Sequence, residues 1–142
     1  MSDDDALRAD FAVVVEDYEK DTPQQFLSRP QLRAIIWEKS NGRCWYCGKE
    51  MNPFRDFSTD HIVARCVGGG QGYDNLVPAC RTCNASKNNR SLEQFRPTLA
   101  RRCAGFPAFT KEQLAYLARQ GVDTDKLLPF DDFQFYFERE GL

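Results

Sequence analysis

Residues 44–48 read CWYCG and residues 80–83 read CRTC, and these two short stretches decide how the centre of the chain folds. Two residues between a pair of thiolates allow one turn of backbone to point both sulfurs at the same ion, and Gly48 suits the left-handed conformation that such a turn often requires. Four thiolates form a closed tetrahedral zinc site, which is structural because it leaves no position for water. Two redox-active pairs are the alternative, but the paired spacing favours a Zn²⁺ site with four ligands: Cys44, Cys47, Cys80 and Cys83.

The segment between the two cysteine pairs is 32 residues long, whereas a plain zinc ribbon has roughly 15 to 20. It contains STDHIVAR at residues 58–65, the loop GGGQG at residues 68–72 and DNLVP at residues 74–78, and NASK follows at residues 84–87. His61 is the only histidine of the chain. It therefore provides the one imidazole available for general base chemistry near neutral pH.

These motifs resemble the HNH endonuclease family in its cysteine-bracketed form, over about a third of the chain at residues 43–88. The two CxxC pairs, the Asp-His pair, the glycine-rich loop, the Asn-Leu-Val run and the Cys-Asn-x-x-Lys ending follow the family's order. The resemblance implies an α+β protein with a ββα-metal (His-Me finger) core, in which two short strands and a helix close over a divalent ion. It also implies a metal-dependent endonuclease that hydrolyses the phosphodiester bonds of DNA.

The resemblance further implies roles for four side chains of this sequence. His61 is expected to activate the attacking water as the general base, and Asp60 is expected to bind the catalytic metal. Asn75 is expected to hydrogen-bond the backbone and keep the His61 loop in position. Asn84 stands where the family often has histidine, which makes this an H-N-N variant, and an amide oxygen can still bind a hard cation. Two oxygen ligands leave room for water and phosphate, so Mg²⁺ or Mn²⁺ is the expected catalytic ion.

The net charge of −2 conceals an uneven distribution. Residues 1–21 carry eight acids and two bases, residues 123–142 carry six acids and two bases, and residues 22–122 have a net charge of +8. A basic centre is typical of a DNA-binding surface, although an ordinary solvated surface explains the charge equally well. Arg65 and Lys87 lie near the motif in sequence, and we expect them either to hold flanking phosphates or to be ordinary surface charges.

The flanks of this centre predict helices with recognisable starts. Ser28 and Pro30 suit the first turn of a helix over residues 30–40, and an apolar period predicts another helix within residues 7–18. SLEQ at residues 91–94 and TKEQ at residues 110–113 read as capping boxes. Pro97 is expected to shorten or kink the first of the two helices that follow. Close to the C-terminus, aromatic and polar residues alternate, which predicts a strand with one buried face: Phe133, Phe135 and Phe137.

We therefore expect three parts: an acidic N-terminal arm over residues 1–29, an HNH nuclease domain with flanking helices over residues 30–103, and a C-terminal helix and acidic aromatic strand over residues 104–142, packed on the core. No apolar run approaches the roughly 20 residues that span a bilayer, and the N-terminus lacks the features of a secretory signal. We expect a cytoplasmic, non-membrane protein with reduced thiols, in which Cys66 and Cys103 are small buried or free thiols.

Two other functions fit part of the same sequence. One is a non-catalytic, zinc-dependent nucleic-acid-binding module, in which Asp60 and His61 serve only as packing residues. The other is a zinc-stabilised protein-interaction domain that uses the acidic aromatic tail. Asp60-His61 together with Asn75 and Asn84 favours the enzyme over both. The substrate's sequence, the number of strands cut, the protein partners and the oligomeric state stay open.

Overall fold

The structure of the protein is a computed structural model that describes residues 28–105, 109–124 and 132–142. The helix predicted within residues 7–18 and most of the acidic arm lie outside these residues. Short 3₁₀ turns occupy Arg65–Val67 and Tyr73–Asn75. The helices and strands follow in the order α2 (Arg29–Glu38), β1 (Phe57–His61), β2 (Leu76–Cys80), α3 (Arg81–Lys87), α4 (Leu92–Cys103), α5 (Lys111–Arg119) and α6 (Tyr136–Glu140).

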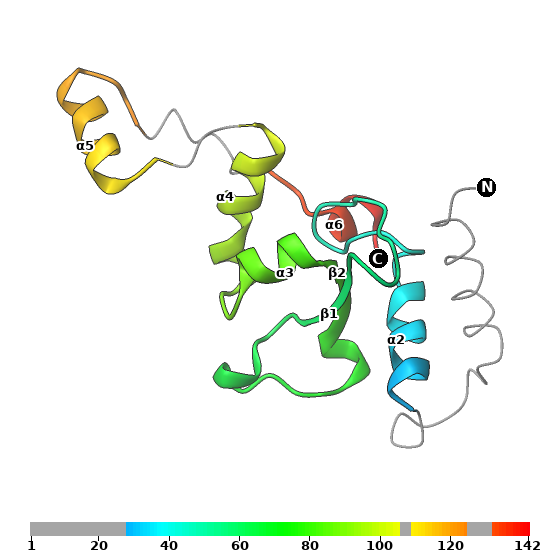
Figure 1. Cartoon of the computed structure of the whole chain (residues 1–142). Coiled ribbons are helices and arrows are strands. Elements are labelled where there is room, and N and C mark those ends of the chain that lie inside the picture. The colour runs from blue at the N-terminus through cyan, green and yellow to red at the C-terminus, as the bar shows by residue number, and fades with distance from the viewer. Residues whose placement is uncertain (1–27, 106–108, 125–131) are drawn as a thin grey trace.

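Strands β1 and β2 form an antiparallel two-stranded sheet, and α3 continues directly from β2 and packs back on the sheet (Figure 1). The register pairs Phe57 with Cys80 at one end and His61 with Leu76 at the other. This arrangement is the expected ββα unit in an α+β protein. It brings the end of β1, which carries His61, and the helix that carries Asn84 into one small substructure.

Helix α2 begins as the sequence predicts. Ser28 is the N-cap, and its side chain and that of Gln31 form a reciprocal capping box, with Pro30 in the first turn. Ala34, Ile35 and Ile36 form the buried face of the helix. Helix α2 therefore belongs to the same core as the sheet, although it precedes the cysteine pairs in the chain.

Helix α4 begins at the predicted capping box of Ser91 and Gln94, but it is not shortened at Pro97 and continues to Cys103. A proline in a helix costs one backbone hydrogen bond, here the one to the carbonyl of Glu93. The buried face of α4 spans the proline with Phe95 on one side and Leu99 on the other. Packing on both sides therefore offsets the missing hydrogen bond.

Among the described residues, no helix has both the length and the apolar character to cross a bilayer.

The predicted C-terminal strand is wrong: the chain is extended only up to Phe135 and then turns into the short helix α6. The helix starts because the carboxylate of Glu138 accepts a hydrogen bond from the Phe135 N–H at 2.9 Å. A strand would require a neighbouring strand, and within the described residues the sheet holds only β1 and β2. The aromatic alternation is still used for burial, because Phe135 is completely buried and stacks on Phe137 with ring centroids 5.7 Å apart.

Helix α5 has the predicted capping box at Thr110 and Gln113, and the chain turns after it with Gly121 at a positive φ. None of its residues is buried, and in Figure 1 it lies apart from the sheet and the other helices. The expected packing of this helix on the core is therefore not found. The two leucines of α5, Leu114 and Leu117, are only half-buried, so the helix offers little apolar surface to bury.

Candidate active site

The four paired cysteines come together as one cluster, whose sulfur atoms all lie within 4.8 Å of one another. Cys47 Sγ and Cys80 Sγ, one from each pair, are 3.9 Å apart. A zinc–sulfur bond of about 2.3 Å puts the sulfurs of a tetrahedral site about 3.8 Å apart. The cluster therefore has the composition and the spacing of a site for one metal ion, with no position left for water.

Gly48 is the residue that allows the first pair to close. Its φ is +77°, and a Cβ built on it would lie 2.7 Å from Cδ2 of Tyr136. The turn thus needs glycine for its conformation, as the sequence predicts, and for the close approach of the C-terminal tail. Backbone N–H groups of Tyr136 and Phe137 donate to the carbonyls of Tyr46 and Trp45 at 2.9 and 3.0 Å. The tail therefore covers the cysteine turn directly.

Arg102 of α4 approaches the same cluster from the other side, with Nη2 at 2.6 Å from Cys83 Sγ. Four thiolates around a divalent ion carry a net charge of −2, which a neighbouring cation stabilises. Charged partners of metal ligands also hold the ligands in place. Arg102 is thus part of the support of the cluster, a contact between α3 and α4 that sequence spacing does not reveal.

Asp60 is almost fully buried, at 5% exposure, and its Oδ2 has two partners. The Tyr46 hydroxyl donates to it at 2.5 Å, and Lys87 Nζ lies 3.1 Å away. Lys87 is completely buried and also donates to the carbonyl of His61 at 2.9 Å. This burial contradicts the surface role expected for Lys87, because an enclosed ammonium already bonded to a carboxylate and a carbonyl does not reach a phosphate.

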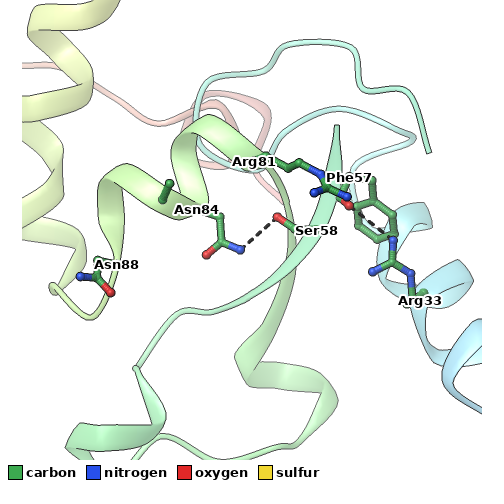
Figure 2. Close-up of a pocket in the computed structure, with 7 residues that line it drawn as sticks. Arg33, Phe57, Ser58, Arg81, Asn84 and Asn88 are labelled. Atoms are coloured by element: carbon green, nitrogen blue, oxygen red, sulfur yellow. Dashed lines mark hydrogen bonds between the residues drawn. The ribbon is translucent and has the colours of Figure 1, made fainter. Parts of the chain in front are cut away.

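Helix α3 runs beside β1, and successive polar side chains of the helix contact successive polar side chains on one face of the strand. Asn84 Nδ2 donates to Ser58 Oγ at 3.0 Å (Figure 2), and one turn later Lys87 meets Asp60. Ser58 and Asp60 are two residues apart on one strand, so they share a face of the sheet. No hydrogen bond is found, among the described residues, for Oδ1 of Asp60 or Oδ1 of Asn84. Asp60 and Asn84, whose side-chain oxygens could bind a hard cation, therefore both lie on the side of β1 that α3 covers.

His61 ends β1 and is half-exposed, with its Nε2 2.9 Å from the side-chain amide of Gln71. With the amide oriented so that both ends are satisfied, its nitrogen donates to His61 Nε2 and its oxygen accepts from Arg65 Nε at 2.8 Å and Nη1 at 3.2 Å. His61 Nε2 then carries a lone pair, which is the state a general base requires. Arg65 is exposed, and the Gln71 side chain lies between it and the imidazole of His61.

Asn75 joins the two ends of the loop between β1 and β2. Its Oδ1 accepts from the Val63 N–H at 2.9 Å, and its Nδ2 donates to the carbonyls of Val63 at 3.0 Å and Gly70 at 2.8 Å. At Gly69 a Cβ would lie 1.7 Å from the Val63 oxygen, so no other residue fits there without moving the loop. These contacts hold the backbone immediately after His61.

An open pocket of about 710 Å³ lies on the outer side of α3 and β1, facing α2 (Figure 2). Asn84 and Ser58 line it, but Asp60 and His61 do not. Arg33 of α2 lies over the ring of Phe57 at 4.5 Å and donates to the Phe57 carbonyl at 3.4 Å. The other lining residues are Arg81, Ala85 and Asn88 of α3 and its C-terminal end. The pocket is thus polar and basic.

The order of these motifs is that of a known family, because residues 44–100 match the family model described as HNH endonuclease. Over this segment, which is less than half of the chain, the protein is similar to HNH endonucleases. A Cas9 protein of Corynebacterium diphtheriae, a CRISPR-associated endonuclease, is 38% identical to the chain over 63 residues, which are 40% of this chain and 6% of that protein. The SPbeta prophage-derived protein YoqL of Bacillus subtilis, whose name places it among HNH endonucleases, is 26% identical over 78 residues, or 45% of this chain and 33% of that protein.

The chain therefore spans less than two thirds of the length of either relative. Among solved structures, the crystal structure of the Type II-C Cas9 enzyme from Actinomyces naeslundii is similar, with a TM-score of 0.47 and 23% sequence identity. That similarity covers 82% of this chain and 14% of the other.

Sequence reasoning missed Gln71, Tyr46 and Arg33 and expected Lys87 at the surface, and all of these except Arg33 had a local signal. Gln71 is the only residue of the loop GGGQG with a functional side chain. Tyr46 lies between Cys44 and Cys47, so its sequence position places it next to the cysteine cluster. Lys87 follows the buried Cys83 by four residues, so helical periodicity puts both on the buried face of α3. Arg33 had no such signal, because it lies before the HNH segment.

Proposed function

We propose that the chain is a metal-dependent endonuclease that hydrolyses DNA phosphodiester bonds, with His61 as the general base. The observation that carries this proposal is the position of His61 at the half-exposed end of β1 within the HNH segment, with its Nε2 2.9 Å from the side-chain amide of Gln71. A water molecule in place of the Gln71 amide would donate to the same nitrogen. Asn75 would keep the imidazole loop in position through Val63 and Gly70.

The donor set beside His61 supports a hard divalent ion, Mg²⁺ or Mn²⁺, bound by Asp60 and Asn84. The carboxylate and the amide each keep one oxygen without a hydrogen bond among the described residues, and both are hard ligands. When bound, such an ion supplies charge neutralisation for the phosphate and the leaving oxygen. Lys87 and Tyr46 would hold the Asp60 carboxylate at its other oxygen, so that it does not rotate away.

For the four-cysteine cluster we propose Zn²⁺ in a structural role. The sulfur-only ligand set suits zinc and leaves no open position for catalysis. The cluster joins the turn before β1 to the start of α3, and it therefore holds the ββα unit that carries His61 and Asn84.

The test is cleavage of supercoiled plasmid by purified protein, with Mg²⁺ and with a chelator. His61→Ala is expected to lower the rate by roughly 10²- to 10⁴-fold, while zinc content, circular dichroism and DNA affinity stay at the wild-type level. Glu112→Gln on the exposed α5 is the matched control and should cleave normally. DNA binding with no cleavage by the wild type in any metal would instead favour the non-catalytic nucleic-acid-binding module.

A further inference from the structure

We propose that Arg33 and Arg81 form a phosphate-binding subsite that holds the DNA backbone next to the phosphodiester that is cleaved. The subsite lies in the pocket between α2, β1 and α3, beside Asn84. This inference rests on the proposed nuclease function and adds the surface by which the chain would grip its substrate.

The two guanidinium groups come from different elements and meet at the rim of one pocket. Figure 2 shows Arg81 at the start of α3 and Arg33 on α2, on either side of the Phe57 ring, with Asn84 and Asn88 further along α3. Arg33 is held in orientation by its position 4.5 Å above that ring and by its hydrogen bond to the Phe57 carbonyl. Arg81 is exposed.

The charges of the pocket are unbalanced. No carboxylate is among the residues that line it. Neither Arg33 nor Arg81 forms an ion pair with any residue that the structure describes. Burial lowers the pKa of Arg33, and the nearby positive charge of Arg81 lowers it further. Two like charges that face one pocket without a counter-ion repel one another, and a bound anion removes that repulsion.

The chemistry of the lining favours a phosphodiester. Planar guanidinium groups match phosphate oxygens through paired N–H donors, and the amide groups of Asn84 and Asn88 can donate to further oxygens. The pocket is open rather than enclosed, so it admits a continuous backbone. Since Asn84 also belongs to the proposed metal site, a phosphate held by the arginines would lie next to the one at the metal. Arg33 precedes residues 44–100, so α2 would add a substrate contact from outside the HNH segment.

The experiment measures binding of a short fluorescent DNA duplex by anisotropy, in a His61→Ala background with Ca²⁺, so that cleavage plays no part. The Arg33→Gln/Arg81→Gln double variant is compared with Lys111→Gln/Arg119→Gln on α5, which removes the same charge. The pocket variant should bind at least about tenfold more weakly, and its slope of log affinity against log salt should fall by about 1.8, as expected for two lost phosphate contacts. Equal affinities and slopes for the two double variants would overturn the subsite.

Two further variants test the phosphate-binding subsite separately from protein folding, and the cleavage assay tests it separately from the nuclease function. Arg81→Gln alone removes an exposed side chain with no partner among the described residues, so its folding is secure, and it should still weaken binding and lower the salt slope by about 0.9. Arg33→Lys keeps the charge but loses the guanidinium plane, and it should recover only part of the affinity. If wild-type protein binds DNA through these arginines yet cuts no plasmid, the nuclease function fails, while phosphate binding by the two arginines stands. If the protein cleaves plasmid but the arginine variants bind DNA as tightly as the wild type, the nuclease function stands and the subsite fails.

Discussion

The hydroxyl of Tyr46, carried by the turn between the first two cluster cysteines, donates a hydrogen bond to Oδ2 of Asp60 at 2.5 Å inside the core. Burial raises the pKa of Tyr46, and the charge of Asp60 raises it further, so the hydroxyl stays protonated and remains a donor. One side chain therefore joins the cysteine cluster to the carboxylate proposed as a ligand of the catalytic metal. The cluster and the candidate active site are physically connected, and a change in one should be felt in the other.

Tyr46→Phe tests this connection. The ring would still pack edge-to-face on Phe95 and Phe135, so the fold and the metal content of the cluster should be retained. Loss of a hydrogen bond to a charged group should lower the free energy of unfolding by about 1.5–3 kcal/mol. The Mg²⁺ concentration for half-maximal cleavage should rise, because Asp60 is held less firmly. Urea denaturation and a Mg²⁺ titration measure both effects, with Tyr116→Phe on α5 as the control. An unchanged Mg²⁺ requirement would contradict the connection.

Lys87→Met should be among the most destabilising substitutions on α3. The side chain is completely buried, and its loss leaves the Asp60 charge without its cationic partner. Breaking a buried ion pair costs roughly 3–5 kcal/mol. The midpoint of urea denaturation should therefore fall sharply, whereas Lys111→Met on the exposed α5 should leave it nearly unchanged. A Lys87→Met protein as stable as the wild type, with normal DNA affinity, would show that the buried pair contributes nothing.

Removal of metal from the cysteine cluster should unfold the centre of the chain, since binding energy at such a site is also folding energy. Cys80→Ser should lose one zinc ion per chain and release the C-terminal tail, because the tail is bonded to the cysteine turn. Trp45 stacks on Phe137 at 5.3 Å, so its fluorescence reports that release. Elemental analysis and fluorescence give the two readouts. Cys66→Ser, at an exposed thiol, is the control and should alter neither. Folding that is indifferent to Cys80→Ser would argue against a structural metal.

Asn84 should determine which metals support cleavage. Asn84→Ala removes one of the two proposed protein ligands and should lower the rate with every ion. Asn84→His adds an imidazole nitrogen and should extend activity towards Ni²⁺, Co²⁺ and Zn²⁺, at some cost with Mg²⁺. Cleavage rates of the three proteins over Mg²⁺, Mn²⁺, Ni²⁺, Co²⁺ and Zn²⁺ decide the point. Full Mg²⁺ activity in Asn84→Ala would remove Asn84 from the ligand set.

The tail should be held more weakly at acid pH. Arg96 binds Glu138 through two hydrogen bonds of 2.7 Å, and these bonds lower the pKa of Glu138 below its ordinary value of 4.5. A carboxyl whose folded pKa is lowered contributes stability above its unfolded pKa and loses it as the pH falls through the folded value. Glu138→Gln should therefore lower Tm near neutral pH, and the difference from the wild type should shrink below pH 4.5. A constant difference across that range would exclude the linkage.

The local features of this protein were determined by its sequence alone. The four-cysteine cluster, the helix cap at Ser28, the two capping boxes at Ser91 and Thr110, and the ββα unit all depend on spacings of two or three residues or on the order of short motifs. Residues two or three positions apart lie within one turn of the backbone, so their spacing fixes whether their side chains can meet. The place of His61 at the end of a strand followed from the same motif order, and its catalytic role stays a prediction.

What only the tertiary structure decided are the contacts between segments that are distant in the chain. Lys87 pairs with Asp60, which lies 27 positions earlier in the chain. The C-terminal tail forms a short helix because Glu138 binds Arg96. Phe135 is buried at the start of this helix, against Tyr46 and Phe95. Likewise, Arg33 and Arg81 face one pocket only because α2 packs beside the sheet. Local preferences carry no information on these pairings, since each depends on desolvation and charge in a core that several elements build together.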